Sequence, residues 1–344
     1  MGMVLGIESS CDETAAALVT SDRRIVAQRI ASQDEQHAPY GGVVPEIAAR
    51  AHADRLAPMI EQVLTDAGAD LSDCDAIAAT AGPGLIGGVM VGLVTAKALS
   101  MAADVPLMAL NHLEGHALSP RLADPDLAFP YCLLLVSGGH CQTLLVEDVG
   151  RYRRLATTID DALGEAFDKT AKVLGLGFPG GPAVERLAAR GDASAVPLPR
   201  PMVGSGEPHF SFAGLKSAVL RARESGTFAD ADIAASFQQA AIDCIIDRLT
   251  IALSDIERPP ALVVAGGVAA NTAIRDSLTQ FAQQHDMRFS APPPALCTDN
   301  AAMIAWAGCE RLSLQAFDPL DVAARPRWPL DPSAEPVRGA GVKA

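Results

Sequence analysis

The sequence has little positive charge. Its 344 residues include 27 Lys and Arg against 41 Asp and Glu, which gives a formal net charge of -14. A protein that binds nucleic acid through bulk electrostatics shows the opposite balance, because each phosphate contact needs a cation. Any polynucleotide must therefore meet a small basic cluster of this chain, such as Arg151-Tyr-Arg-Arg154 or Arg221-Ala-Arg223, or a basic patch on a partner.

The sequence also lacks paired cysteines. Its seven cysteines are scattered, odd in number and without a CxxC pair. This pattern is typical of reduced thiols in the cytosol and argues against a disulfide framework or a zinc ribbon. We therefore expect a cytoplasmic protein.

A targeting segment and a long hydrophobic run are missing as well. No basic region followed by a long apolar run stands at the N-terminus, so no signal peptide is expected. The longest apolar window, residues 85–110, is interrupted by Lys97 and Asp104 and broken by Pro106. It predicts a buried helix followed by a strand, and no membrane span.

What is present is enough apolar sequence for a large core, with a repeat in it. The chain is 49% hydrophobic and long enough for two domains. A strand, a polar turn, a returning strand and a third short strand occur twice. The strands are expected at 3–7, 14–20 and 25–31, and again at 131–136, 142–147 and 152–157. Such a repeat predicts two similar halves around a cleft, with the first turn of each half facing the other.

A pair of histidines follows an apolar strand in Asn111-His-Leu-Glu-Gly-His116. In a helix, His112 and His116 lie on the same face and can share one metal ion, although such pairs are also common without a metal. Asn111 is a good N-cap, and Gly115 indicates a close approach to the helix backbone. Glu114 lies about 200° around the helix from His112. The HExxH arrangement of metalloproteases is therefore absent.

Asp299 is a candidate third ligand. It stands in Cys297-Thr-Asp-Asn-Ala-Ala-Met303, just before a predicted helix that runs to about Leu312. We expect Thr298 or Asp299 to cap this helix, and capping alone would also explain the carboxylate.

Two further stretches have open interpretations. The glycine-rich turn at 81–88 leads into a helix, where it either binds a phosphate or carboxylate or simply allows close packing. A helix predicted over 160–170 places Asp161, Glu165 and Asp168 on one face. This face is either a site or a solvated surface, and Asp160 or Asp161 could instead cap the helix.

A series of motifs occurs in order along residues 3–312. They are Ile7-Glu-Ser-Ser-Cys-Asp-Glu-Thr14, Gly41-Gly-Val-Val-Pro-Glu46, Thr80-Ala-Gly-Pro-Gly-Leu85, Asn111-His-Leu-Glu-Gly-His116, Val136-Ser-Gly-Gly-His140, Gly164-Glu-Ala-Phe-Asp-Lys-Thr170, Pro179-Gly-Gly-Pro182, Ser211-Phe-Ala-Gly-Leu-Lys216, Gly266-Gly-Val-Ala-Ala-Asn271 and Cys297-Thr-Asp-Asn-Ala-Ala302. Together they closely resemble the bacterial TsaD family of tRNA adenosine threonylcarbamoyltransferases, formerly called O-sialoglycoprotein endopeptidases.

The resemblance implies an α/β fold of the actin, hexokinase and Hsp70 type (ASKHA), with two similar halves around a cleft. The first half would comprise residues 1–128 and 299–322, and the second half residues 129–298. Residues 323–344, which are rich in proline, would form a mobile tail.

The resemblance also assigns site residues. His112, His116 and Asp299 match the family's ligands for one divalent metal, usually iron and sometimes zinc. The positions that match its substrate contacts are Leu135, Val136, Ser137, Gly138, Gly139, Asp168, Gly181 and Asn271. The chain departs from the family pattern at three positions, where Cys141 replaces a frequent Thr and Ala213 and Ala269 replace frequent Ser residues.

The chemistry implied is transfer of a threonylcarbamoyl group from threonylcarbamoyl-AMP to the exocyclic amine of the adenosine 3′ of a tRNA anticodon. AMP is a good leaving group, so the protein mainly positions the reactants and stabilises charge. The amine must lose a proton, and a base is expected within hydrogen-bond reach. Asp12, Glu13 and His140 are the candidates, although they could instead orient the metal ligands or the phosphate.

The resemblance further implies partners. Relatives in bacteria work with a paralogous TsaB-like protein of the same fold and a small TsaE-like ATPase, and no membrane is involved. Three alternatives remain open from the residues: a metalloprotease resting on the histidine pair, a sugar or acetate kinase on the same fold, and a non-catalytic scaffold.

Overall fold

A computed structural model of the protein describes residues 2–40 and 42–337. The chain divides into two compact units. Unit 1 comprises the described residues up to Asp126 together with Thr298–Pro332, and unit 2 comprises Leu127–Cys297 with residues 333–337. Gly41, the first residue of one family motif, and residues 338–344 of the predicted tail lie outside the described residues.

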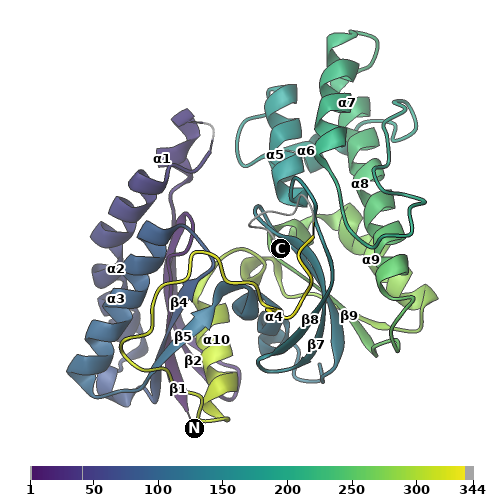
Figure 1. Ribbon diagram of the computed structural model, residues 1–344. Coiled ribbons are helices and arrows are strands. Elements are labelled where there is room, and N and C mark those ends of the chain that lie inside the picture. The colour runs from purple at the N-terminus through teal and green to yellow at the C-terminus, as the bar shows by residue number, and fades with distance from the viewer. Residues whose placement is uncertain (1, 41, 338–344) are drawn as a thin grey trace. The chain divides into compact units, whose positions relative to one another are not determined.

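Unit 1 is built on a five-stranded mixed sheet in the order β3-β2-β1-β4-β5 (Figure 1). Neighbours are antiparallel between β1, β2 and β3, and parallel between β1, β4 and β5. Its elements are β1 (Met3–Glu8), β2 (Glu13–Thr20), β3 (Ile25–Ser32), α1 (Asp34–His37), η1 (Ala38–Tyr40), α2 (Pro45–Ala67), η2 (Leu71–Asp73), β4 (Ala76–Gly82), α3 (Ile86–Ala103), β5 (Leu107–Asn111), α4 (His112–Ala123) and α10 (Ala301–Leu312).

The two faces of this sheet are covered by different helices. Alternate side chains of a strand point to opposite faces, so Leu5 and Ile7 share one face and join an apolar cluster with Leu56 of α2. Gly6 points the other way, toward α10. A Cβ on Gly6 would lie 2.4 Å from the carbonyl oxygen of Ala301. The missing side chain lets α10, which comes from the far end of the sequence, pack directly on β1.

Of the helices in residues 2–40 and 42–337, α3 alone has the length and mean hydropathy of a membrane span. Its inner face, which includes Val89, Leu93 and Ala96, is buried, and α3 packs against β4 and α2. The ammonium group of Lys97 donates a hydrogen bond to the main-chain oxygen of Val322. These contacts make α3 a core helix of unit 1.

Unit 2 repeats the same sheet, in the order β10-β9-β6-β7-β8. Its elements are β6 (Tyr131–Val136), β7 (Cys141–Asp148), β8 (Arg151–Thr157), α5 (Leu163–Leu174), α6 (Gly180–Ala188), α7 (Ala213–Glu224), α8 (Asp230–Ala252), β9 (Ala261–Ala265), η3 (Gly267–Ala270), α9 (Thr272–Gln284), β10 (Arg288–Ser290) and η4 (Pro294–Leu296). In each unit three antiparallel strands are followed by two parallel ones. The predicted internal repeat is therefore confirmed.

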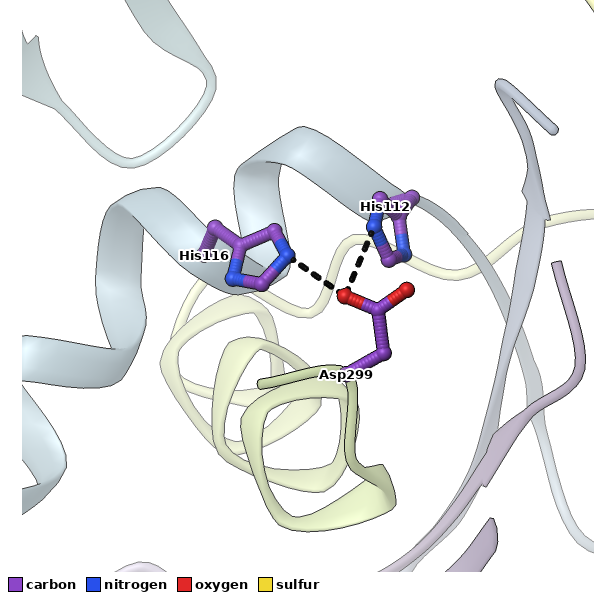
Figure 2. A group of neighbouring side chains, drawn as sticks. All are labelled: His112, His116 and Asp299. Carbon is purple, nitrogen blue, oxygen red and sulfur yellow. Dashed lines mark hydrogen bonds and ion pairs between the residues drawn. The ribbon is translucent and has the colours of Figure 1, made fainter. Parts of the chain in front are cut away.

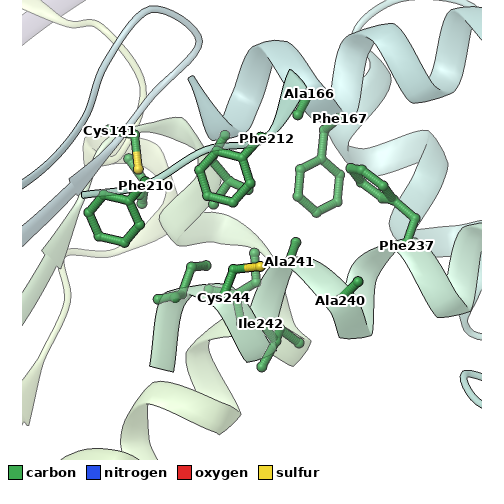
Figure 3. Close-up of a cluster of buried hydrophobic side chains, with 14 of the residues drawn as sticks. Cys141, Ala166, Phe167, Phe210, Phe212, Phe237, Ala240, Ala241, Ile242 and Cys244 are labelled. Carbon is green, nitrogen blue, oxygen red and sulfur yellow. The ribbon is translucent and has the colours of Figure 1, made fainter. Parts of the chain in front are cut away.

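The core of unit 2 contains a group of aromatic rings (Figure 3). Phe167 and Phe237 meet edge to face with their centroids 5.0 Å apart, and Phe210 stacks near Phe212. Cys244 lies beside them, and burial raises the pKa of its thiol to about 12. All seven cysteines are free in the structure. The buried thiol therefore behaves as an apolar side chain of the core.

Residues 318–328, here called the C-terminal strap, lie along unit 1. Asp318 accepts a hydrogen bond from the backbone nitrogen of Ala109. Farther along, Arg325 donates its backbone N–H to Ala81, and its guanidinium lies over the ring of Trp328. The strap thus binds the ends of β4 and β5, next to the start of α4.

Candidate functional site

The histidine pair lies at the start of α4. Asn111 caps this helix as predicted, because its side-chain oxygen accepts a hydrogen bond from the N–H of Leu113 at 2.9 Å. His112 and His116 are 6% and 1% exposed, so both imidazoles are buried. A Cβ on Gly115 would lie 2.7 Å from Cδ1 of Ile304. The close approach that this glycine indicated is therefore that of α10, not of a ligand.

Asp299 reaches the histidines because it does not cap its helix. The N-cap of α10 is Asn300, whose side-chain oxygen accepts from the N–H of Met303. The prediction of Thr298 or Asp299 as the cap was therefore wrong, by two residues or by one. The carboxylate of Asp299 is left free to turn toward α4, and Figure 2 shows both imidazoles directed at it.

The two distances from Asp299 to the imidazoles fit a shared metal ion. Oδ1 of Asp299 lies 3.0 Å from Nε2 of His116 and 3.5 Å from Nε2 of His112. The ligand atoms of the three residues all lie within 4.8 Å of one another. Two ligands bound to one ion at about 2.0–2.2 Å are roughly 3.0–3.5 Å apart. A ligand set of two imidazoles and one carboxylate suits iron, and also suits zinc.

The charges at this site support one another. Burial opposes the ionisation of His112, but the carboxylates of Asp299 and Glu8 outweigh it and raise the pKa of His112 well above 6.5. Burial likewise opposes the ionisation of Asp299, but His112 and His116 hold the pKa of that carboxyl well below 3.8. Asp299 therefore offers an ionised oxygen, as a metal ligand must.

Glu8 is a functional candidate that the sequence analysis missed. It is completely buried at the end of β1, and its Oε2 lies 3.0 Å from Nδ1 of His112. Burial alone would raise the pKa of Glu8, but His112 and Thr80 lower it below the usual value, so the carboxylate is ionised. The only signal in the sequence was an acidic residue that ends an apolar strand.

The three predicted base candidates lie in different places. Asp12 lies in the turn after β1 and Glu13 is the first residue of β2, both in unit 1, whereas His140 lies in the turn between β6 and β7 of unit 2. Burial, together with Asp299 and Asp12, raises the pKa of Glu13 to about 10. Glu13 therefore keeps its proton near neutral pH and can donate a hydrogen bond, but it cannot accept a proton.

The glycine-rich turn at 81–88 packs against the polar turn after β1. A Cβ on Gly84 would lie 2.5 Å from the main-chain oxygen of Ser10, and one on Gly88 would lie 2.3 Å from that of Ser9. The N–H of Leu85 donates to Ser10 at 2.7 Å. Of the two interpretations of this turn, close packing accounts for both glycines.

The predicted substrate residues all belong to unit 2, and five of them lie in β6 and the turn that follows it. Leu135 and Val136 are buried in β6 itself. A Cβ on Gly164 would lie 2.6 Å from the main-chain oxygen of Ser137, and one on Gly266 would lie 2.4 Å from that of Val136. These glycines bring the start of α5 and the end of β9 against the turn. Ideal Cβ positions on Gly138, Gly139 and Gly181 have no heavy atom within 4 Å, so their backbone is open.

Two acidic side chains of the predicted helix face form ion pairs with a lysine. The ammonium group of Lys169 lies 2.6 Å from Asp161 and 2.8 Å from Glu165. Asp168 accepts a hydrogen bond from the N–H of Gly180 and so positions the start of α6. The last predicted contact, Asn271, caps α9 by accepting from the N–H of Ile274.

Asp160 has a role that its local sequence did not predict. The helix expected over 160–170 begins at Leu163, and its N-cap is Ala162. Asp160 instead accepts hydrogen bonds from the backbone of Phe212 at 2.8 Å and Ala213 at 3.2 Å. It therefore holds the first turn of α7, so neither Asp160 nor Asp161 caps its own helix.

Known proteins identify the family of the chain. The family model TsaD, described as tRNA N6-adenosine threonylcarbamoyltransferase, matches residues 24–306. The chain belongs to the TsaD family. It is 79% identical to the tRNA N6-adenosine threonylcarbamoyltransferase of Erythrobacter litoralis and 74% identical to that of Novosphingobium aromaticivorans, with complete coverage of every chain.

A solved structure shows the same fold at much lower identity. Component A of (R)-2-hydroxyglutaryl-CoA dehydratase from Acidaminococcus fermentans matches with a TM-score of 0.55 and 16% identity, over 91% of this chain and all of the other. The predicted ASKHA fold is confirmed. So is the predicted activity: this TsaD-family chain is a tRNA N6-adenosine threonylcarbamoyltransferase, which decides against the protease, kinase and scaffold alternatives.

Proposed function

We propose that this TsaD-family enzyme takes the threonylcarbamoyl group from threonylcarbamoyl-AMP and transfers it to N6 of the adenosine 3′ of the tRNA anticodon, releasing AMP. We propose further that one divalent metal, iron (Fe2+) or alternatively zinc, is held by His112, His116 and Asp299. The observation that carries this proposal is the convergence of the three side chains on ligand atoms within 4.8 Å of one another.

The metal would bind and polarise oxygens of the threonylcarbamoyl group. The residues of the chain then have separate tasks. The amine of adenine loses a proton as it attacks, and a carboxylate or neutral imidazole nearby would accept it. Asp12 and His140 are proposed for this step. Glu13, whose pKa of about 10 keeps it protonated, is proposed as a hydrogen-bond donor to the substrate.

The nucleotide part of the donor is proposed to bind unit 2. The supporting observation is the open backbone of Gly138, Gly139 and Gly181, where no neighbouring atom would block an approaching ligand. Leu135, Val136 and Ser137 would form the wall of this subsite. Asp168 and Asn271 would complete it by holding the first turns of α6 and α9.

We propose that the enzyme works in the cytoplasm with partners, namely a paralogous TsaB-like protein of the same fold and a small TsaE-like ATPase. The net charge of -14 supports this, because a polyanionic tRNA needs basic surface from elsewhere. An exposed apolar stripe on α3 supports a docked protein. The stripe consists of Ile86, Met90, Val94 and Met101, which are 47%, 51%, 57% and 69% exposed.

The test of the proposed reaction uses preformed threonylcarbamoyl-AMP, unmodified tRNA and purified chain with measured metal content. We expect transfer to require the metal, to be slow with the chain alone, and to rise sharply when the partners are supplied. Full multiple-turnover activity of a chain stripped of metal by a chelator would overturn the metal proposal. Full activity that does not respond to the partners at any salt concentration would overturn the partner proposal.

A surface variant tests where the partner binds. Val94→Glu places a charge in the middle of the apolar stripe on α3 without touching the buried face. We expect the partner's stimulation of transfer to be lost while the melting temperature stays unchanged. Leu220→Glu, at an exposed apolar residue of unit 2, is the matched control and should leave the stimulation intact.

A further inference from the structure

We infer that Glu8 is a positioning residue for the proposed metal centre, and that it fixes His112 with the proton on Nδ1 and the lone pair of Nε2 directed at the metal. The inference rests on the proposed metal site. It assigns a role to a residue on β1, more than a hundred positions from the histidine that it holds.

The contacts of Glu8 and Asp299 assign separate roles to the two ring nitrogens of His112. Oε2 of Glu8 lies 3.0 Å from Nδ1 of His112 and accepts the hydroxyl of Thr80 at 2.6 Å, while Oε1 accepts the N–H of Ser10 at 2.6 Å. A neutral imidazole that binds a metal through Nε2 carries its hydrogen on Nδ1. In the proposed metal centre Nδ1 of His112 therefore donates its hydrogen to Glu8. Nε2 is the atom that faces Asp299, at 3.5 Å.

The second histidine has no such support. Nδ1 of His116 is buried and makes no hydrogen bond within the described part of the chain. Its ring is held from one side only, by the contact between Nε2 and Asp299 at 3.0 Å. A carboxylate behind a ligating imidazole both orients the ring and makes it a stronger ligand. Only His112 has this carboxylate, so loss of Glu8 should affect one histidine and not the other.

The position of Glu8 is itself rigid. The carboxylate is fully buried, and the backbone that follows it packs against Gly84 of the glycine-rich turn and against Gly88 in the first turn of α3. The hydroxyl of Thr80, on the neighbouring strand β4, fixes the carboxylate from the side. Because every contact of Glu8 comes from unit 1, the support for His112 is complete within the unit that carries the ligands.

The experiment compares Glu8→Gln with wild type, and uses Zn2+ as the probe ion. Zinc affinity is measured by competition with a chromogenic chelator, and the ring nitrogens are observed by NMR of zinc-loaded protein with 15N-labelled histidine. We expect Glu8→Gln to bind zinc about 10- to 100-fold more weakly. The signals of His112 should lose the single form protonated at Nδ1, while those of His116 stay in place.

Thr80→Val provides a second variant in case Glu8→Gln does not fold. It removes one hydrogen bond that holds the carboxylate and keeps the size of the side chain, so we expect a smaller loss, roughly three- to tenfold, of zinc affinity. Thr14→Val is the matched control. It removes an equally buried hydroxyl that contacts His52 instead of Glu8, and zinc affinity should not change.

The outcomes separate the two proposals. If wild type binds zinc tightly and the folded Glu8 and Thr80 variants bind it equally well, with unchanged signals for His112, the role of Glu8 is wrong and the metal centre stands. If wild type binds zinc no better than His116→Ala, the metal centre itself is wrong and the role of Glu8 falls with it.

Discussion

The side-chain nitrogen of Asn111 lies 3.0 Å from the main-chain oxygen of Trp328 and donates a hydrogen bond to it. The oxygen of the same amide caps α4. One side chain thus connects the first turn of the histidine helix to the C-terminal strap. The strap also accepts from the N–H of Gly84 through Pro326, which places it against the glycine-rich turn.

Removal of the last part of the strap, residues 323–328, should therefore destabilise unit 1. We expect a chain that ends after Val322 to melt about 5 °C lower than the full chain. It loses about three hydrogen bonds of roughly 1 kcal/mol each, one of which is the bond from the side-chain nitrogen of Asn111. The measurement is calorimetric melting of metal-free protein. A chain that ends after Val337 keeps the strap and should melt like the full chain. Equal melting of both truncated chains would mean that the strap contributes no stability.

Loss of His112 or His116 should abolish threonylcarbamoyl transfer and leave the fold intact. We expect His112→Ala and His116→Ala each to lower threonylcarbamoyl transfer at least about a hundredfold, because a lost ligand costs no less than a lost partner of a ligand. Bound metal and transfer are measured on the same samples, with circular dichroism to confirm folding. His285→Ala, which removes a histidine in unit 2, is the control. Normal transfer by a metal-free double variant would refute the site.

Acid should destabilise the protein through His52. This side chain is fully buried and forms a hydrogen bond with the hydroxyl of Thr14. Burial lowers the pKa of its imidazole below 6.5. The unfolded chain takes up the proton more readily, so the contribution of His52 to stability is present above about pH 6.5 and is lost as the pH falls through the lower folded pKa. Between about pH 7.5 and 5.5, wild type should lose more unfolding free energy in urea than His52→Gln. Parallel losses in the two proteins would exclude His52 as the cause.

The close packing of two turns predicts the effect of one methyl group. Gly88→Ala would place its Cβ 2.3 Å from a backbone oxygen of Ser9, which cannot move without moving the turn after β1. We expect a loss of about 1–3 kcal/mol of unfolding free energy, and weaker metal binding because Glu8 precedes that turn. Gly206→Ala, where a Cβ has no neighbour within 4 Å, should be neutral. Equal stability of the two variants would show that the turn after β1 shifts to accommodate the added Cβ without a loss of unfolding free energy.

Interactions between residues close in the sequence were predictable, and interactions between residues far apart in the sequence were not. The cap at Asn111 follows from a polar residue before a helical pattern, and the structure has it there. In Thr298-Asp-Asn300 all three residues are good caps, so the sequence could not choose among them. The choice is made by the histidines, which attract the carboxylate of Asp299 and leave the cap to Asn300.

The roles of Glu8 and Asp160 could not be predicted from the sequence for the same reason. Each is an acidic residue whose partner lies far along the chain, His112 for Glu8 and the start of α7 for Asp160. Periodicity describes a window of a few residues and says nothing about such pairs. The resemblance to TsaD supplied the three proposed metal ligands, but the contact of Glu8 with His112 was visible only once β1 and α4 were placed in the structure.

The discontinuous build of unit 1 sets an order of events during protein synthesis. His116 and Asp299 are 183 positions apart in the sequence, and a ribosome covers that distance in roughly 10–40 s at about 5–20 residues per second. During that time the strands of unit 1 have been synthesised but α10 has not. This is the helix that packs closely against Gly6 and Gly115. A chain arrested by the ribosome in this interval carries two histidines and no third ligand. The proposed metal site is thus completed only in chains whose translation is nearly finished.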